Sequence, residues 1–292
     1  MDIVHLREWI GREESAADEI TPAQAALLAA TLDRSDPEPR NGDLPPLWHW
    51  LYFLPRHRLS DLAPDGHARR GGFLPPVPLA HRMWAGGRFE FHRPLRIGDR
   101  VTRTSRIEDV ILKQGRSGAL VFVTVHHEIR NEEGVALTEE QDIVYRDSAR
   151  VYRDSVSVYR DAAGAVPPPA APGGEDWERE IRPGDVLLFR YSALTFNSHR
   201  IHYDRRFATN VEGYPGLVVH GPLIATLLLD LLRCNLPEAD VAKFSFRAVS
   251  PLFDTAPFRI CGKPDGDTIR LWAKTENGNL AMDATATLRA ES

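Results

Sequence analysis

The segment that most restricts the fold is an apolar stretch in the second half of the chain. Residues 222–233 are almost all Leu, Ile and Ala, and only Thr226 and Asp230 interrupt them. A helix that is apolar on every side has to be enclosed by other elements of a soluble protein. The residues that follow are rich in β-forming side chains and are divided by Gly or Asp-Gly turns. They predict an antiparallel sheet that wraps this helix, with strands at 243–249, 257–262, 268–274 and 281–288.

The first half of the chain has a similar order of elements. Thr21 is a natural N-cap, Pro22 suits the first helical turn and Gln24 completes a capping box, so a helix is predicted here. Stretches rich in Val, Ile and Thr then predict strands at 101–111, 120–126 and 143–145, with a turn at 131–134. A further short strand is predicted at 186–191, in the second half. We therefore expect an α+β fold made of two similar halves.

A proline-rich segment separates the two halves. Residues 165–174 read AVPPPAAPGG, and neither a helix nor a central strand tolerates three consecutive prolines. Just before it, the sequence Val-Tyr-Arg-Asp occurs at 144–147, 151–154 and 158–161. We interpret this repeat as a local duplication that lengthens the linker. The predicted organisation is an N-terminal domain at 1–147, a linker at 148–176 and a C-terminal domain at 177–292.

Charge and composition argue against several classes of function. The chain carries 36 Lys and Arg against 41 Asp and Glu, a formal net charge of −5, whereas nucleic-acid-binding proteins usually show a basic excess. No apolar run approaches the length of a membrane span, and the N-terminal MDIVH lacks the basic start and apolar core of an export signal. We predict a cytoplasmic protein without a nucleic-acid or membrane partner, and a homodimer because most soluble oligomers are of that kind.

The sequence gives no sign of a metal or an organic cofactor. It contains no GxGxxG, no Walker loop and no GxSxG. Its two cysteines, Cys234 and Cys261, form no CxxC pair, so we interpret them as buried free thiols in a reducing compartment. His199 and His202 have the i, i+3 spacing of neighbours on a helix, but no third ligand is evident. We therefore predict neither a metal site nor a cofactor.

The candidate site is a polar stretch that leads into the apolar helix. Residues 189–227 contain His199, His202 and His220 together with two asparagines and several arginines. These groups can hydrogen-bond to a substrate or transfer protons. Their concentration beside a buried helix favours a catalytic loop, and the alternative is a polar surface loop with solvated histidines.

This stretch resembles the signature of the MaoC-like and R-specific enoyl-CoA hydratases. That signature runs Asp-x-Asn-Pro-Ile-His, then Ala, then a Gly or His-Gly helix start. His202, preceded by Ile201, stands at the signature His; Ala208 follows, and residues 220–221 open the helix as His-Gly. The resemblance implies a double hotdog fold, in which each half is an antiparallel sheet wrapped around a helix and the two sheets pair edge to edge. It also implies activity on acyl-CoA thioesters.

The sequence departs from this signature at three positions. Asn197 stands at the catalytic Asp, His199 at the Asn and Arg200 at the Pro. This variant resembles one branch, the mesaconyl-C4-CoA and itaconyl-CoA hydratases and the mitochondrial hydroxyacyl-thioester dehydratases. The first half, which has no matching His signature, would be a degenerate partner that shapes the acyl tunnel. First-half stretches similar to this branch are PLWHW at 46–50, GGFLPP at 71–76 and RMWAGG at 82–87.

The signature residues permit an acid–base mechanism. Hydration of an enoyl thioester needs a base for the water, a proton for the α-carbon and donors for the thioester oxygen. His202 is the expected acid and base, whereas the Asn197 amide can orient a water but cannot exchange a proton. We expect His202 to take the proton of the water and return it to the α-carbon. The alternatives for a second acid are His199, Tyr191 and Asp204.

Backbone N–H groups at the start of the apolar helix are the expected oxyanion donors. Gly221 precedes Pro222, which suits a first helical turn, and the positive end of the helix dipole lies there. A glycine would let the substrate approach closely; the alternative is that Gly221 packs tightly against a strand. His220 is counted among the residues around the substrate, with a structural rather than a catalytic role.

The branch acts on dicarboxyl acyl groups, so the resemblance implies recognition of a free carboxylate. Arg200 is the candidate, because a guanidinium pairs well with a carboxylate; the alternative is a surface arginine that faces solvent or the CoA phosphates. Arg205, Arg206 and Arg247 are candidates for CoA phosphate contacts. The expected reaction is reversible hydration of mesaconyl-C4-CoA or itaconyl-CoA to citramalyl-CoA. Three alternatives stay open: an acyl-carrier-protein dehydratase of fatty acid synthesis, a hotdog thioesterase and a non-catalytic acyl-CoA-binding subunit.

Overall fold

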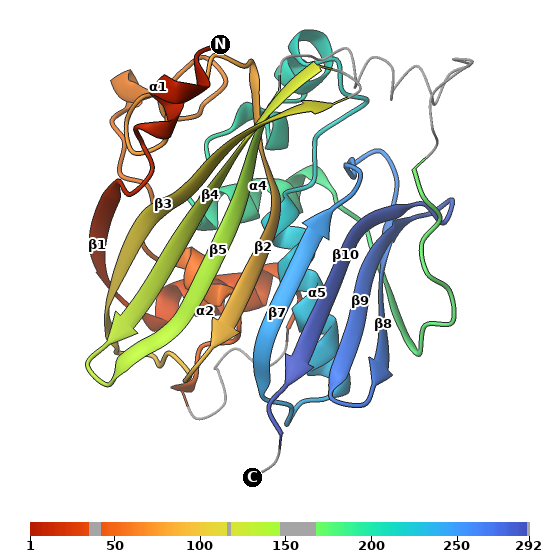
Figure 1. Ribbon diagram of the computed structural model, residues 1–292. Coiled ribbons are helices and arrows are strands. Elements are labelled where there is room, and N and C mark those ends of the chain that lie inside the picture. The colour runs from red at the N-terminus through yellow and green to blue at the C-terminus, as the bar shows by residue number, and fades with distance from the viewer. Residues whose placement is uncertain (35–41, 116–117, 147–167, 291–292) are drawn as a thin grey trace.

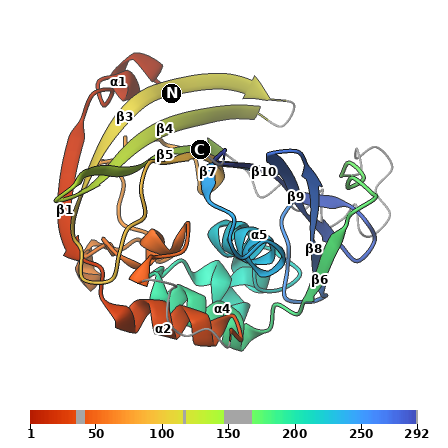
Figure 2. The same ribbon diagram turned by 90° about the horizontal axis from the view of Figure 1, so that it is seen from below.

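The computed structural model of the protein describes residues 1–34, 42–115, 118–146 and 168–290. Their strands form one 10-stranded sheet in the order β1-β3-β4-β5-β2-β7-β10-β9-β8-β6. The sheet curls so that its concave face encloses helices and loops (Figure 1, Figure 2). Strands of the first half fill one side of this sheet and strands of the second half fill the other.

The two halves join at the strands β2 (His81–Phe91) and β7 (Val241–Ala248), which pair antiparallel. Gly86 lies opposite Arg247 there, and a Cβ on Gly86 would lie 2.7 Å from the carbonyl oxygen of Phe246. Only glycine permits so close an approach of the two strands. The expected edge-to-edge pairing of two sheets is therefore confirmed.

The second half wraps its sheet around the helix α5 (Gly221–Asn235). Every residue of α5 from Leu223 to Leu232 is buried, as its apolar composition predicted. Asp230 is tolerated there because guanidinium nitrogens of Arg34 and Arg179 lie 2.6 and 2.7 Å from its carboxylate. Around α5 lie β6 (Trp177–Ile181), β7, β8 (Phe258–Asp265), β9 (Thr268–Thr275) and β10 (Leu280–Leu288). All of these strands except β6 were predicted.

The first half has a longer sheet, but within the described ranges this sheet encloses no comparable helix. Helix α2 (Pro22–Thr31) begins where predicted, yet it packs against α4 (Asp185–Leu194) at the open side of the sheet (Figure 2). Loops, the 3-10 turns η2 (Trp48–Leu51) and η3 (Leu59–Asp61), and a cavity take its place. The strands of this half are β1 (Glu13–Glu19), β2, β3 (Arg100–Gly115), β4 (Gly118–Asn131) and β5 (Gly134–Arg146).

The capping box predicted for α2 is not formed. The Thr21 hydroxyl contacts the side chain of Gln24 and caps no backbone N–H of the helix. Pro22 nevertheless occupies the first turn, as predicted. The start of the helix is therefore set by the proline and by the extended backbone of Thr21 rather than by a reciprocal side-chain cap.

The strand predicted at 186–191 is wrong, because these residues belong to α4. Leu188, Tyr191 and Ser192 are buried at helical spacings of three and four, while Val186 and Phe189 are exposed. A short apolar run with Val, Phe and Tyr carries the propensity of a strand, and its length does not separate it from one helical face. The prediction of two buried thiols is half wrong: Cys261 is buried and Cys234 is exposed.

Four elements were not predicted: the helix α1 (Ile3–Arg7) and the strands β1, β2 and β6. The strands β1 and β6 stand at the two ends of the sheet. Their sequences, EESAADE and WEREI, are rich in charged residues, which is how edge strands avoid further pairing. The same charges hide such strands from a search for apolar alternation.

Most of the predicted linker, 148–176, lies outside the described residues. So do the second and third copies of the Val-Tyr-Arg-Asp repeat, at 151–154 and 158–161. The first copy begins in β5, which ends at Arg146. The end of the predicted linker lies against the second half, because Leu280 N–H donates to Pro169 O and Ala171 N–H donates to Gly278 O, both at 2.8 Å. The division at 148–176 remains a prediction.

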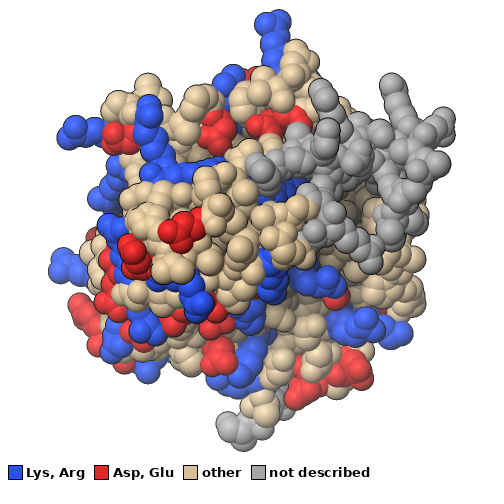
Figure 3. All heavy atoms as spheres, turned by 45° about the horizontal axis from the view of Figure 1, so that its top comes forward, with Lys and Arg blue, Asp and Glu red and all other residues tan. Residues whose placement is uncertain are grey.

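Charged side chains of both signs are spread over the surface. On the face shown in Figure 3, basic and acidic side chains are interspersed, so this face offers no extended basic surface for nucleic acid. In the part of the chain that the structure describes, no helix is both long enough and apolar enough to cross a membrane.

Candidate active site

The signature residues lie in the loop between α4 and α5. This loop contains the 3-10 turn η4 (Arg200–His202) and the π-turn η5 (Phe207–Val211). The N–H of Asn197 donates to Ser192 O at 2.8 Å, and the N–H of Val218 donates to Ile201 O at 3.0 Å. These backbone bonds fold the loop onto itself and hold it between α4 and the start of α5.

His202 is buried, and its ring is fixed by one hydrogen bond. Its Nδ1 lies 2.7 Å from the carbonyl oxygen of Val218. A carbonyl can only accept, so Nδ1 carries the hydrogen and Nε2 of the neutral ring is left to accept a proton. Burial lowers the pKa of His202 to about 4, although the bond to Val218 raises it. His202 is therefore neutral at neutral pH, the state that a general base needs.

His220 supports the ring of His202. Its Nε2 is 2.8 Å from the Ser192 hydroxyl oxygen, and the side chain is buried. Burial holds the pKa of His220 well below its usual value, so this ring is neutral too. Tyr191 packs edge-on against His220, with ring centroids 5.0 Å apart. The ring of His220 also stacks on that of His202, so His220 contacts the predicted base directly, in keeping with a structural role.

Asn197 follows the end of α4, and Gly221 is the first residue of α5. The Oδ1 of Asn197 accepts the N–H of His199 at 3.0 Å, which leaves the amide Nδ2 as a donor. A Cβ added to Gly221 would meet no described atom within 4 Å. The alternative that Gly221 packs tightly against a strand is therefore wrong, and the start of α5 faces open space.

A cavity of about 1180 Å³ lies between the first-half sheet and this loop. Asn197, Tyr191 and Pro222 of the second half line it, as do Gly66, His67 and Arg82 of the first. His199, His202 and His220 are not part of this wall and pack against one another behind it.

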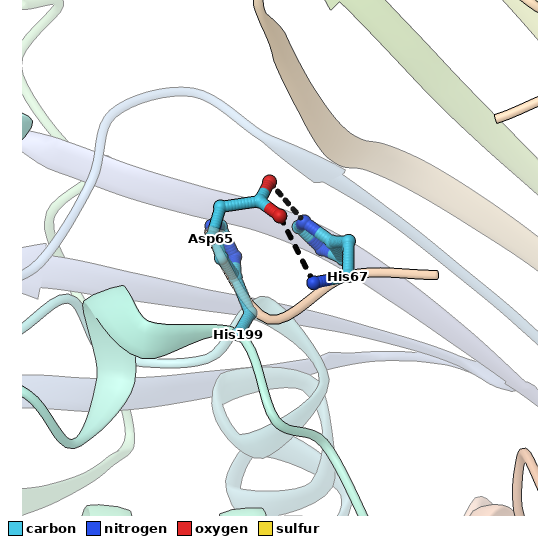
Figure 4. A group of neighbouring side chains, drawn as sticks. All are labelled: Asp65, His67 and His199. Carbon is cyan, nitrogen blue, oxygen red and sulfur yellow. Dashed lines mark hydrogen bonds and ion pairs between the residues drawn. The ribbon is translucent and has the colours of Figure 1, made fainter. Parts of the chain in front are cut away.

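A loop of the first half completes the site with the residues Asp65, Gly66 and His67. The Nδ1–H of His67 donates to Asp65 Oδ2 at 2.9 Å, and its backbone N–H donates to Asp65 Oδ1 at 3.0 Å (Figure 4). The ring of His67 lies 3.8 Å from that of His199, between centroids. Asp65 thus orients one imidazole that lines the cavity beside the predicted catalytic loop.

This first-half loop is bound to the signature loop through its backbone. The Ser198 hydroxyl donates to Gly66 O at 2.6 Å, and the N–H of Arg200 donates to Asp65 O at 2.9 Å. Gly66 has φ +90°, and a Cβ there would lie 1.8 Å from the carbonyl oxygen of Ser198. Only glycine fits both this backbone conformation and this contact.

The electrostatics of the site favour neutral imidazoles. Burial lowers the pKa of His199 to about 2, and burial also lowers the pKa of His67 against the opposing effect of the Asp65 hydrogen bond. The positive charge of Arg82 lowers the pKa of both rings further. Both shifts favour the uncharged form of these imidazoles beside a cation.

The structure does not place Arg200 for carboxylate recognition. Its guanidinium is 2.7 Å from Asp204 Oδ2, donates to Pro64 O at 3.0 Å and lies 4.2 Å from the ring centre of Phe207. Arg200 is not in the cavity wall. This correction follows from geometry: the i, i+4 pair with Asp204 directs the side chain along its own loop. Asp204 itself accepts the N–H of Phe207 at 3.0 Å and is likewise outside the wall.

The other predicted arginines lie outside the cavity wall as well. Arg205 pairs with Asp254, and Arg206 is exposed. Arg247 is exposed on β7 and lies 3.8 Å from Asp283 of β10. The strand neighbour Phe246 is buried, so Arg247 points away from the concave face. Contacts of these three arginines with CoA phosphates remain a prediction.

Two groups of described residues bring three potential metal ligands together. They are Asp65, His67 and His199, and Glu175, Glu178 and Cys261, with ligand atoms within 4.8 Å of one another in each group. The first group joins His199 to two residues of the first half and does not include His202. Asp65 and His67 already hydrogen-bond to each other, and the expectation of no metal stays a prediction.

Comparison with known proteins fits this geometry. The sequence profile of the hydroxyacyl-thioester dehydratase type 2 proteins matches residues 47–254. The chain belongs to this family. Among its curated relatives, a mesaconyl-C4-CoA hydratase of Chloroflexus aurantiacus is 48% identical in sequence to this chain, over 96% of both chains. A mitochondrial hydroxyacyl-thioester dehydratase type 2 of Schizosaccharomyces pombe is 28% identical over 84% of this chain and 82% of its own.

Solved structures show the same fold for this dehydratase-family protein. A MaoC-like dehydratase of Phytophthora capsici matches with a TM-score of 0.72 at 12% identity, and covers 100% of this chain and 99% of its own. HtdX of Mycobacterium tuberculosis matches with a TM-score of 0.61 at 18% identity over 94% and 99%. The α+β double hotdog is therefore confirmed, and the chain is a hydro-lyase of the hydratase and dehydratase class acting on acyl thioesters.

The sequence did not reveal the contribution of the first half to the site. Asp65 and His67 stand in the segment PDGHARRGG, which reads as a turn with charged residues. Its Asp-Gly pair and its position just before the branch-specific GGFLPP were the available signals. Contact with a loop more than a hundred residues away cannot be read from either.

Proposed function

We propose that the protein catalyses the reversible hydration of a branched dicarboxyl enoyl-CoA, mesaconyl-C4-CoA or itaconyl-CoA, to citramalyl-CoA. The support is the 48% identity, over 96% of both chains, with a protein named mesaconyl-C4-CoA hydratase. A cavity of about 1180 Å³ beside the loop of His202 is large enough for an acyl group and part of its carrier.

The observation that carries the mechanism is the hydrogen bond from His202 Nδ1 to the carbonyl of Val218. It fixes the tautomer in which Nε2 is the proton acceptor. In hydration, His202 Nε2 takes a proton from water as the oxygen bonds to the β-carbon. In mesaconyl-C4-CoA, whose double bond joins the α- and β-carbons, the alkene electron pair moves toward the α-carbon and the thioester oxygen. The imidazolium then returns the proton to the α-carbon. One water thus supplies both the hydroxyl group on the β-carbon and the new hydrogen on the α-carbon, and His202 ends neutral.

Asn197 and Gly221 serve the same step. The amide Nδ2 of Asn197 holds the attacking water, since its Oδ1 is bound to the N–H of His199. The N–H of Gly221, at the start of α5 and beside open space, donates to the thioester oxygen as negative charge develops there. Donors fixed at a developing oxyanion are a large source of rate acceleration.

A second candidate is dehydration of 3-hydroxyacyl groups on acyl-carrier protein. The match to the hydroxyacyl-thioester dehydratase type 2 profile over residues 47–254 favours it. The chemistry is the same reaction in reverse with a different carrier, so the residue roles above are retained.

The proposal is tested by following the absorbance of the enoyl-thioester substrate after purified protein is added. Mesaconyl-C4-CoA, itaconyl-CoA and crotonyl-CoA are compared, with a crotonyl-carrier-protein substrate and a thiol reagent for free CoA. Fast loss on a dicarboxyl substrate without thiol release supports the proposal. Preference for the carrier-protein substrate supports the second candidate. Thiol release would indicate a thioesterase, and binding without any turnover would indicate a non-catalytic subunit.

A further inference from the structure

Arg82 is one of the cations in the cavity wall that have no carboxylate partner among the described residues. Arg82 belongs to β2 and lines the cavity together with Gly66 and His67. Most charged arginines of this chain are paired; Arg88 on the same strand, for example, binds both Glu140 and Asp142. A half-buried guanidinium that faces a cavity without a counter-ion favours the binding of an anion there.

The position of Arg82 is fixed by strand register. Arg82 pairs directly with Tyr145 on β5, and directly opposed residues of antiparallel strands share one face of the sheet. Tyr145 is fully buried, with 0% of its surface exposed. Arg82 therefore projects from the concave face, toward the cavity and not toward solvent.

A buried hydroxyl stands beside Arg82. The Tyr145 OH has no hydrogen-bond partner among the described residues. Burial raises the pKa of this hydroxyl, and the nearby guanidinium of Arg82 opposes that shift. A carboxylate bound to Arg82 would also accept a hydrogen bond from the Tyr145 hydroxyl, so that this buried donor is satisfied.

Arg82 is also close to the reacting groups. Arg82 lines the cavity together with His67, whose ring centroid lies 3.8 Å from that of His199. In mesaconyl-C4-CoA the free carboxylate is attached to the β-carbon that the water attacks. A residue that binds this carboxylate must therefore lie near the reacting carbons, and Arg82 lines the same cavity as Asn197 of the signature loop.

Two other arginines of this region, Arg70 and Arg200, are bound to other groups. Arg70 donates to the carbonyl oxygens of Val77, Leu79 and Ala80, and Arg200 is bound to Asp204 and Pro64 O. Arg82 is the remaining guanidinium of this set that faces the cavity without a carboxylate. It also opens the segment RMWAGG, whose role the sequence left unassigned.

We propose that Arg82 binds the free carboxylate of the acyl group and makes the site selective for dicarboxyl substrates. This inference rests on the proposed function, because it names the residue that selects that substrate class. The expected partner is a carboxylate on a short acyl-CoA; an acyl group that ends in methyl has nothing to offer this guanidinium.

Arg82→Met, which removes the charge at similar length, is compared with Arg88→Met on the same strand, whose side chain pairs on the outer face. In Arg82→Met we expect kcat/KM for mesaconyl-C4-CoA to fall about 100-fold and kcat/KM for crotonyl-CoA to change less than about threefold. The reason is that only a substrate with a free carboxylate loses a charge-assisted hydrogen bond. Arg82→Lys, which keeps a point charge, should lie between. Equal losses on both substrates, or none, would overturn the inference.

Binding of unreactive analogues separates this inference from the proposed function. Succinyl-CoA and butyryl-CoA have acyl chains of equal length that end in carboxylate and methyl. Wild type and Arg88→Met should bind succinyl-CoA more tightly, and Arg82→Met should lose that preference. A preference that persists in Arg82→Met would overturn the role of Arg82, even with hydration established. A preference that depends on Arg82 would uphold it even if hydration of both dicarboxyl substrates failed. Absence of any preference in wild type would overturn the inference.

Discussion

The imidazoles of His202 and His220 are stacked, with ring centroids 3.7 Å apart and 17° between the planes. Two protonated rings at this distance would repel each other strongly, since both are buried. The stack is therefore an arrangement for neutral imidazoles. It fixes the plane of the His202 ring, while the Val218 carbonyl fixes its tautomer. The chemistry that remains to His202 is acceptance of a proton at Nε2.

Stability should fall as the pH drops from 6.5 toward 4. Burial lowers the pKa of both His202 and His127 to about 4, whereas unfolded histidine titrates near 6.5. The unfolded chain then binds more protons than the folded one in this window, so stability is full above pH 6.5 and is lost below it. Each group should contribute about 2 kcal/mol between pH 7 and pH 5. Urea unfolding at the two pH values measures this.

The variant His127→Gln is the control for that measurement. It removes one of the buried neutral imidazoles and should reduce the loss of stability between pH 7 and pH 5 by about 2 kcal/mol. An unfolding free energy that is equal at pH 7 and pH 5 in the wild type would contradict the buried neutral state of these imidazoles.

Asn197→Asp should abolish hydration although it restores the residue of the related signature. The carboxylate can still accept the N–H of His199, as Oδ1 does now at 3.0 Å. It has no N–H to hold the water, and its charge would favour a protonated His202. We expect a loss of about 10³-fold in kcat, measured with the same absorbance assay. Asn210→Asp, on the exposed turn η5, is the matched control. A gain in activity, or no change, would mean that Asn197 does not act through its amide.

Gly221→Ala should separate stability from activity. A Cβ at Gly221 meets no described atom within 4 Å, and alanine is favoured over glycine in a helix by about 0.5–1 kcal/mol, so the fold should be as stable or slightly more stable. The methyl would occupy the space in front of the N–H groups, and kcat/KM should fall at least about tenfold.

Gly184→Ala serves as the control for Gly221→Ala. Gly184 stands at the start of α4, also with open space around it, and lies outside the cavity wall. It should leave kcat/KM unchanged. If Gly221→Ala were fully active, the thioester could not bind at this helix start.

Gly66→Ala should damage both stability and activity. The residue has φ +90°, and the new Cβ would lie 1.8 Å from the Ser198 carbonyl oxygen. Gly213 has φ +75° with no atom within 4 Å of its Cβ position, so Gly213→Ala carries the backbone cost alone. We expect Gly66→Ala to lose about 2 kcal/mol more than this control and to lower kcat by displacing His67. Thermal unfolding and the absorbance assay check both; equal effects of the two variants would refute the interloop contact.

The second half of the fold could be predicted because its helix allows few alternatives. The apolar residues on all sides of α5 require an enclosing sheet, and β7 to β10 follow at once with clear turns. The helix α4 was misread because five of the six residues at 186–191 are Val, Leu, Phe or Tyr, and such a run fits a strand as well as one helical face. The strand β1 was missed because charged edge strands lack apolar alternation.

The site could be predicted only where its residues are neighbours in sequence. His202, Asn197 and Gly221 belong to one loop and one helix start, so a local signature contains them. Arg200 has the right chemistry in the same loop, but its direction depends on Asp204 and Phe207. Asp65, His67 and Arg82 reach the site through the pairing of the two halves, and their distance along the chain hides this.

The role of His202 as the acid and base is tested most directly by a comparison of the wild type with His202→Ala on mesaconyl-C4-CoA. Absorbance loss is followed at equal concentrations of protein shown to be folded by thermal unfolding. We expect rapid hydration by the wild type and a loss of about 10³-fold or more in the rate of the variant. A folded His202→Ala protein that hydrates the substrate within about tenfold of the wild-type rate would contradict the assignment of His202 as the acid and base.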